Sequence, residues 1–171
     1  VRQANEYARA NNRAPFTVTS PQFSVAEMIE APWAGCISVS GAQGESSRAY
    51  YRDNDIALIT WSSLAGGFMT GKFTRDNLDS FTNGWDTVSI KGYAYESNFQ
   101  RLDRVMELAK EKGASPAQIS LAYSMSVPDN IFAVIANWEV EQIADNLKSL
   151  DINLSPEEIA WLEMKTEEKP V

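Results

Sequence analysis

The pattern of apolar and polar positions predicts short strands that alternate with helices along the chain. Residues 56–60 and 131–135 are nearly continuous apolar runs, which is typical of strands covered on both faces in a parallel sheet. Residues 16–20 form a run rich in β-branched side chains, and Pro21 stops it. The pattern therefore predicts an α/β fold with three strands and about six helices.

Helical spacing and capping residues predict where the helices lie. We expect helices over residues 2–11, 45–53, 98–112, from 116 past 123, over 139–150 and from 156 onward. Ser115 and Ser155 each begin a capping-box pattern, and Gly113 is expected to be a C-cap. The 139–150 helix is expected to bury a core stripe of Val140, Ile143, Ala144 and Leu147. Residues 25–44 are expected to be irregular, and residues 73–97 to form a long loop.

Composition and charge narrow the class of protein. The chain has 171 residues, of which 44% are hydrophobic and 22% charged, as in an ordinary globular domain. A net charge of −8 argues against nucleic acid or an anionic membrane as the main partner. The chain has no apolar run of about 18 residues and opens without a signal peptide. Together with the single cysteine, Cys36, these features predict a cytoplasmic protein.

The complete absence of histidine limits the chemistry that the chain can perform. It excludes a histidine-assisted nucleophile and a histidine-liganded zinc site. One cysteine also excludes thiolate metal clusters. We therefore identify no catalytic residue and no metal site in this sequence.

The segment 56–72 carries the clearest functional signal. The strand at 56–60 ends at Trp61, which offers a flat aromatic face, and small residues follow that let backbone amides approach a ligand. Lys72 adds a positive charge, so the segment suits a flat ring and a phosphate. A core tryptophan followed by a glycine-rich loop and a solvated lysine is the alternative.

The order of three motifs resembles the aldo-keto reductases, (β/α)8 barrels that use NADPH to reduce aldehydes and ketones. Residues 61–72 resemble the segment after the seventh barrel strand, and residues 135–147 the eighth strand with the start of the next helix. Residues 115–123 resemble the helix that precedes strand eight. The resemblance covers essentially the whole chain. A doubly wound fold is disfavoured because no strand is followed by a Gly-x-Gly-x-x-Gly turn.

The resemblance implies that residues 1–171 are a single incomplete domain, the C-terminal half of a partial TIM (β/α)8 barrel. Its parallel strands six, seven and eight would be the three predicted strands. The family's catalytic tyrosine, lysine, aspartate and histidine come from the first four units, which have no counterpart here. We expect the chain alone to be inactive, and the intact protein to take a nicotinamide cofactor and a small carbonyl substrate.

The resemblance also implies a set of cofactor-binding residues. Trp61 would stack on the nicotinamide, residues 62–66 would line the pyrophosphate, and Lys72 would be a charge partner. The full set is Ser20, Trp61, Ser62, Ser63, Leu64, Ala65, Gly66, Lys72, Ala136, Trp138, Gln142, Asp145 and Asn146. For the last three, which would reach phosphate and adenine, an ordinary helix surface is the alternative.

Several positions depart from the family pattern. Ser63 replaces the usual proline, Ser20 stands where many members have a glutamine, and Trp138 replaces a serine. Residues 136–142 contain no arginine or lysine to meet a 2′-phosphate. NADP is therefore expected from the family, and NAD remains possible.

A partial barrel also poses a physical problem. Three strands leave two open edges and expose apolar faces that the other strands would cover. We expect the chain to self-associate or to pair with a complementary N-terminal half. A non-catalytic fragment or assembly module is the alternative function.

Overall fold

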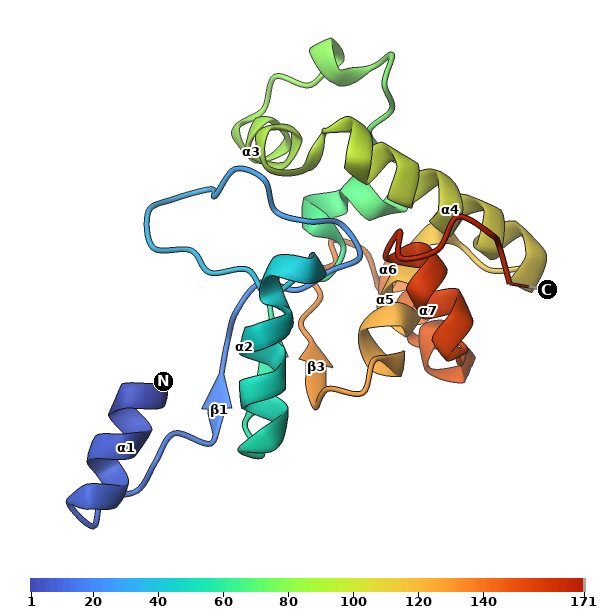
Figure 1. Cartoon of the computed structure of the whole chain (residues 1–171). Helices are drawn as coiled ribbons and strands as arrows, with labels where there is room; N and C mark the ends of the chain where they lie inside the picture. Colours follow the sequence, from blue (N-terminus) through green and yellow to red (C-terminus); the bar gives the residue numbers. More distant parts are fainter. Residues whose placement is uncertain (171) are drawn as a thin grey trace.

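The computed structural model describes residues 1–170 and contains a three-stranded parallel sheet with helices packed on one side (Figure 1). The strands are β1 (Val18–Thr19), β2 (Ala57–Thr60) and β3 (Ile131–Ala133). The α-helices are α1 (Arg2–Ala10), α2 (Gly41–Asp53), α3 (Gly84–Tyr93), α4 (Glu96–Lys112), α5 (Pro116–Ser126), α6 (Val140–Leu147) and α7 (Pro156–Leu162). Short 3-10 helices are η1 (Ala65–Thr70), η2 (Leu78–Ser80) and η3 (Lys148–Asp151). The predicted α/β class with three parallel strands is confirmed.

The central strand, β2, sets the register of the sheet. Leu58 pairs with Thr19 of β1 and with Ile131 of β3, and Ile59 pairs with Phe132. Helical connections separate the strands along the chain, because parallel neighbours need crossovers. All three strands therefore point their carboxyl ends to the same edge of the sheet, and Figure 1 shows the arrows of β1 and β3 in this common direction.

The two faces of the sheet differ in burial. Leu58 and Thr60 are fully buried on the face that the helices cover. On the other face Ile59 is 41% exposed and Phe132 58% exposed. The prediction that these strands are covered on both faces is therefore wrong. The expected exposure of an apolar sheet face is confirmed, and it is the face that a closed barrel would turn toward its axis.

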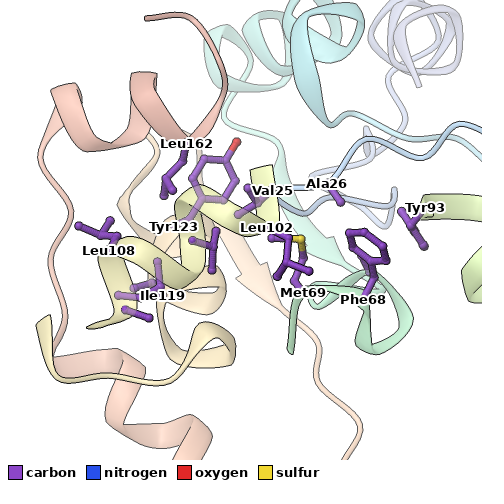
Figure 2. Packing of buried hydrophobic residues seen from close by; sticks show 14 of the residues in the cluster. Val25, Ala26, Phe68, Met69, Tyr93, Leu102, Leu108, Ile119, Tyr123 and Leu162 are labelled. Atoms are coloured by element: carbon purple, nitrogen blue, oxygen red, sulfur yellow. The ribbon is translucent and has the colours of Figure 1, made fainter. Parts of the chain in front are cut away.

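The hydrophobic core lies between the helices and the covered face of the sheet (Figure 2). Phe23 stacks on Tyr123 of α5 with ring centroids 5.5 Å apart, and Phe68 of η1 contacts Phe99 of α4 at 5.0 Å. Leu162 of α7 closes the core and is fully buried. The core thus joins elements from both ends of the chain.

The predicted caps at Ser115, Ser155 and Gly113 are confirmed, whereas α4 begins at Glu96 and α6 ends at Leu147. Ser115 and Ser155 each form a complete capping box with a proline in the first turn. Gly113 ends α4 in the left-handed conformation, with φ of 62°. Nearby residues determine these helix starts, because the capping side chain and its backbone partner lie within three residues of each other.

The predicted core stripe of α6 is wrong. Val140 is 75% exposed, Ile143 43% and Leu147 53%, and Ala144 is exposed as well. The helix forms as expected, but its apolar face turns away from the core. In a closed barrel this face would meet the helix of a neighbouring unit, which these residues do not contain.

Two predicted irregular segments contain helix. Residues 84–93 form α3, although the sequence predicts a loop over 73–97, because Asn83 accepts a hydrogen bond from the Asp86 amide (2.8 Å) and Tyr93 is buried. Helix α2 begins at Gly41, four positions before the expected start at Glu45. There Arg48 donates to the carbonyl of Gly41 at 3.1 Å. These hydrogen bonds are local, and tertiary contacts add to them, since Tyr93 is buried and Arg48 pairs with Asp129 at 3.4 Å.

We expect truncation of a buried core side chain to lower stability more than truncation of an exposed side chain of α6. Leu102→Ala should lower the free energy of unfolding by about 2–5 kcal/mol, because Leu102 is 3% exposed. Ile143→Ser should change it by less than about 0.5 kcal/mol, because Ile143 lies on the exposed face of α6. Urea unfolding measures both free-energy changes. Equal losses of stability in the two variants would contradict the placement of α6.

Candidate functional site

The candidate site begins where β2 ends, at Trp61. The Trp61 amide donates to the carbonyl of Pro21 at 3.3 Å, which ties the ends of β1 and β2 together. Its ring stacks on that of Trp33, with centroids 5.6 Å apart and an interplanar angle of 19°. Trp61 is only partly buried. A flat aromatic ring therefore stands at the carboxyl edge of the sheet, where α/β proteins bind ligands.

The backbone after Trp61 turns through left-handed conformations. The residues with positive φ are Ser62 (54°), Ala65 (52°), Gly66 (62°) and Gly67 (92°). Non-glycine residues in this region cost on the order of 1 kcal/mol or more, so their surroundings must hold them. The Ala65 amide donates to the Ser62 carbonyl at 2.7 Å, which closes the first turn.

The alternating backbone handedness of this segment is a feature that it shares with anion-binding loops. Leu64, with φ of −103°, precedes Ala65 in the left-handed region. Successive residues of opposite hand direct their amide groups into one concavity, which suits phosphate oxygens. Gly66 also packs closely on α3, because a Cβ there would lie 2.2 Å from the Ser89 Oγ. The close contact with α3 fixes the shape of the loop.

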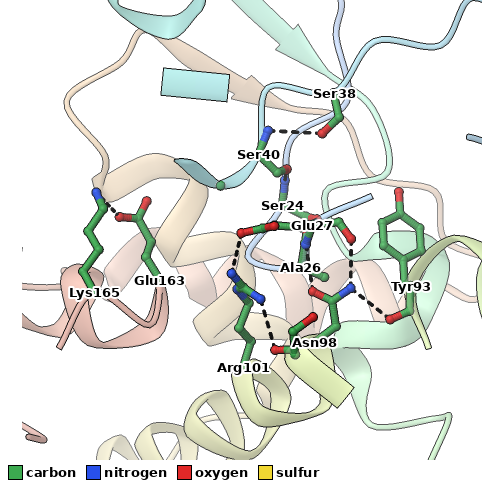
Figure 3. A network of polar contacts seen from close by, with 12 residues as sticks. Ser24, Ala26, Glu27, Ser38, Ser40, Tyr93, Asn98, Arg101, Glu163 and Lys165 are labelled. Carbon is green, nitrogen blue, oxygen red and sulfur yellow. Dashed lines mark hydrogen bonds and ion pairs between the residues drawn. The ribbon is translucent and has the colours of Figure 1, made fainter. Parts of the chain in front are cut away.

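Tyr93, at the end of α3, supports Ser62 from below the loop. Burial raises the pKa of Tyr93 to about 12, and a hydrogen bond with the Ser62 side chain opposes this shift only partly. The Asn98 side chain donates to the Tyr93 carbonyl (2.9 Å) and the Glu27 carbonyl (2.8 Å), which anchors the end of α3 (Figure 3). Tyr93 is therefore protonated at neutral pH and helps to position Ser62.

The side chain of Ser63 has a structural role. The residue is buried, and its hydroxyl donates to the carbonyls of Thr60 (3.3 Å) and Val134 (3.2 Å). This pair of contacts joins the end of β2 to the segment after β3. Any role of Ser63 toward a ligand would therefore rest on its backbone.

Lys72 forms an ion pair with Asp86 of α3 at 2.5 Å. Its ammonium group also lies over the rings of Phe73 and Phe81, at 5.1 and 5.2 Å. The hydrogen bond from Lys72 holds the pKa of the Asp86 carboxyl below its ordinary value. The positive charge expected for a phosphate is thus present at the end of the segment, and an acidic side chain balances it.

The second part of the site lies after β3. Trp138 is 90% exposed, and its amide donates to Gln142 Oε1 at 2.9 Å. The Asn146 side chain donates to Asn137 Oδ1 at 2.7 Å. Gln142 and Asn146 therefore hold the turn that leads from β3 into α6. Ala136 is exposed in the same turn.

Two further sequence-predicted residues, Asp145 and Ser20, also have partners within the protein. Asp145 accepts a hydrogen bond from Gln118 Nε2 (2.8 Å) and pairs with Lys148 (3.2 Å). The Asp145 side chain thus links α6 to α5. The Ser20 hydroxyl donates to the Ile59 carbonyl at 2.6 Å and joins β1 to β2.

The structure brings the predicted residues together in two groups, at the ends of β2 and β3, which Ser63 connects. Their roles toward a cofactor stay predictions. Trp33, Tyr93 and Asp86 have no predicted role, because all three lie in segments expected from the sequence to be irregular. The spacing of Asn83 and Asp86 is a capping signal that could have indicated α3.

Residues 1–170 hold no group of three or more His, Cys, Asp or Glu side chains placed to bind a metal ion. In the same residues no helix is both long enough and apolar enough to cross a membrane.

Comparison with known proteins agrees with this architecture. Residues 5–167 match the Aldo/keto reductase family. The chain is similar to a versiconal hemiacetal acetate reductase of Aspergillus parasiticus, with 34% identity over 67% of this chain and 33% of the relative. It is also similar to an aryl-alcohol dehydrogenase [NADP(+)] of Phanerodontia chrysosporium, with 26% identity over 95% of this chain and 40% of the relative.

Among solved structures, the chain is similar to a thermostable aldo-keto reductase, Tm1743, determined with the inhibitor epalrestat. The TM-score is 0.59 at 18% identity, over 95% of this chain and 44% of that chain, so this likeness concerns the fold. The chain spans less than half the length of each of these proteins.

The three-stranded parallel sheet and its flanking helices have a fold similar to a fragment of an aldo-keto reductase (β/α)8 barrel. The chain belongs to the aldo/keto reductase family. Members of this family use nicotinamide cofactors and act on carbonyl substrates, so membership supports an oxidoreductase function.

We expect Gly66→Ala to disturb the loop more than Gly67→Ala does. Both residues have positive φ, but only at Gly66 would a Cβ meet another atom, the Ser89 Oγ at 2.2 Å. Gly67→Ala should cost about 1 kcal/mol from backbone strain, and Gly66→Ala roughly 2–3 kcal/mol. Adding Ser89→Gly should recover part of the Gly66→Ala loss in urea unfolding. If the two single variants lost the same stability, the close contact with α3 would be wrong.

The Lys72–Asp86 pair should make stability depend on pH. Because Lys72 lowers the pKa of Asp86 in the folded protein, the pair stabilises the fold above the ordinary carboxyl pKa. This contribution is lost as the pH falls below about 4. Asp86→Asn should therefore flatten the fall of the urea midpoint between neutral and acidic pH, whereas Asp79→Asn, on exposed η2, should not. Identical pH profiles for the two variants would contradict a stabilising pair.

Proposed function

We propose that this chain is the cofactor-binding half of an aldo-keto reductase barrel. The observation that carries the proposal is Trp61 at the carboxyl end of β2, followed directly by the left-handed loop of residues 62–67. A flat ring and an anion-binding backbone lie in the order that a nicotinamide ring and its pyrophosphate require. Family membership supports the same cofactor class.

Each part of the site would have a defined role. Trp61 would stack on the nicotinamide ring, and the backbone of residues 62–66 would line the pyrophosphate. Lys72 would add positive charge near the phosphates if its ammonium group turned from Asp86. The turn after β3, held by Gln142 and Asn146, would lie beside the adenosine half of the nucleotide.

The 2′-phosphate decides between NADP and NAD. We propose NADP, because the name of the Phanerodontia chrysosporium relative includes NADP(+). Residues 136–142 contain no arginine or lysine, so the charge at this turn would contribute little to the binding of a 2′-phosphate. A small difference in affinity between NADPH and NADH is therefore expected.

The bound cofactor would supply a hydride from nicotinamide C4 to the carbonyl carbon of a small substrate. Residues of this chain would bind and orient the nucleotide, while the proton for the carbonyl oxygen would come from a tyrosine of the other half. The chain lacks histidine and spans less than half the length of its relatives. We therefore propose that it has no turnover by itself, and that residues 1–171 are the back half of the domain.

The exposed apolar surfaces favour a second candidate, an assembly module without catalysis. Ile59 and Phe132 are exposed on the open face of the sheet, and Val140 and Leu147 on α6. These surfaces would suit an N-terminal half barrel or a second copy of the chain. The cytoplasmic location expected from the sequence stays a prediction.

We expect NADPH to bind the 171-residue chain and quench its tryptophan fluorescence without being oxidised when an aromatic aldehyde is added. Trp61→Ala should weaken binding roughly three- to tenfold, because the ring loses its stacking partner. Trp85→Ala is the matched control, since Trp85 is 75% exposed on α3 and lies outside the predicted site.

Three outcomes would decide against parts of this proposal. Turnover by the chain alone would show that the proposal of an inactive chain is wrong. Equal affinities of the Trp61→Ala and Trp85→Ala variants for NADPH would contradict the stacking role of Trp61. A chain that self-associates but binds neither NADPH nor NADH would favour the assembly module.

A further inference from the structure

Trp33 is an aromatic residue at the site to which the proposed function gives no role. It lies in the connection between β1 and α2, and 56% of its surface is exposed. Nevertheless its ring lies nearly parallel to that of Trp61, at 19° and with centroids 5.6 Å apart. One face of Trp61 is therefore covered by a second indole.

The segment that carries Trp33 is anchored at both ends. The Ile29 amide donates to the carbonyl of Gly92 in α3 at 2.9 Å. At the other end the Gln22 amide donates to the Ile37 carbonyl, also at 2.9 Å. Trp33 thus projects from a segment whose two ends are fixed.

The tip of the segment is a tight turn. The Cys36 amide donates to the Trp33 carbonyl at 3.4 Å, and Gly35 in this turn has φ of 86°. Gln22 forms β-bridges both with Ser38 of this segment and with Trp61. The segment and Trp61 therefore share an anchor, which keeps the two indoles in register.

We propose that Trp33 is a positioning residue for the nicotinamide ring. It covers one face of Trp61 and leaves the opposite face for the cofactor, so that three flat rings stack in the order Trp33, Trp61, nicotinamide. A side chain held in place before binding loses less conformational freedom when the ligand arrives. The inference rests on the proposed function, because it assumes that Trp61 receives the nicotinamide.

The test compares Trp33→Ala, Trp33→Phe and the control Trp85→Ala in the 171-residue chain. Calorimetry measures binding of NADPH and of 2′,5′-ADP, which lacks the nicotinamide. Trp33→Ala should weaken NADPH binding roughly two- to fivefold and leave 2′,5′-ADP unchanged. Trp33→Phe should restore most of the affinity, because a phenyl ring can still stack.

Circular dichroism can detect the stacking of Trp33 on Trp61 in the absence of ligand. Two stacked indoles produce an exciton couplet in the far-ultraviolet circular dichroism spectrum. Trp33→Ala and Trp61→Ala should both abolish this couplet, whereas Trp85→Ala should retain it. Persistence of the couplet in Trp33→Ala would overturn the stacking of these two residues.

The binding results separate the inference from the proposed function. If the unaltered chain binds neither NADPH nor 2′,5′-ADP, the proposed function fails and the inference fails with it. If it binds both and Trp33→Ala binds NADPH equally well, only the inference fails. Tighter NADPH binding by Trp33→Ala would also overturn it, since Trp33 would then occupy the place of the nicotinamide.

Discussion

The pairing of β2 with a parallel strand on each side is the constraint on which the rest of the structure depends. It aligns the carboxyl ends of the strands at one edge, and Ser63 strengthens that edge by bridging from β2 to the segment after β3. The loop of residues 62–67 starts from this fixed point. Its left-handed residues cost free energy, which packing against α3 offsets. The position of the site is thus set by the sheet beneath it.

The sheet is covered on one face only, and this asymmetry connects the fold with the proposed function. Apolar side chains of β2, β3 and α6 remain exposed, although their sequence pattern is that of buried elements. Such a pattern is consistent with a barrel whose other strands lie outside these residues. The same exposed surfaces explain why assembly without catalysis is the second candidate. Both candidates depend on what covers the open face.

Around Trp61 the molecule combines contacts from two separate segments. Trp33 comes from the β1–α2 connection, and Tyr93 and Asp86 come from α3. Each of them restrains a residue that the family resemblance placed at the cofactor: Trp33 stacks on Trp61, Tyr93 supports Ser62, and Asp86 binds Lys72. The predicted ligand residues are therefore surrounded by groups that fix their positions. A preorganised site of this kind binds with a smaller loss of conformational freedom.

The sequence by itself determined the features that arise from short-range physics. The capping boxes at Ser115 and Ser155, the C-cap at Gly113 and the order of strands and helices follow from neighbouring residues, as does the motif around Trp61 that indicates the family. Helix α3 also has a local cap, at Asn83, but only the tertiary structure decided that the apolar face of α6 is exposed and that Trp33 stacks on Trp61. Periodicity shows that a helix has an apolar face but not which partner is present to cover it, and contacts between distant segments leave no local signal.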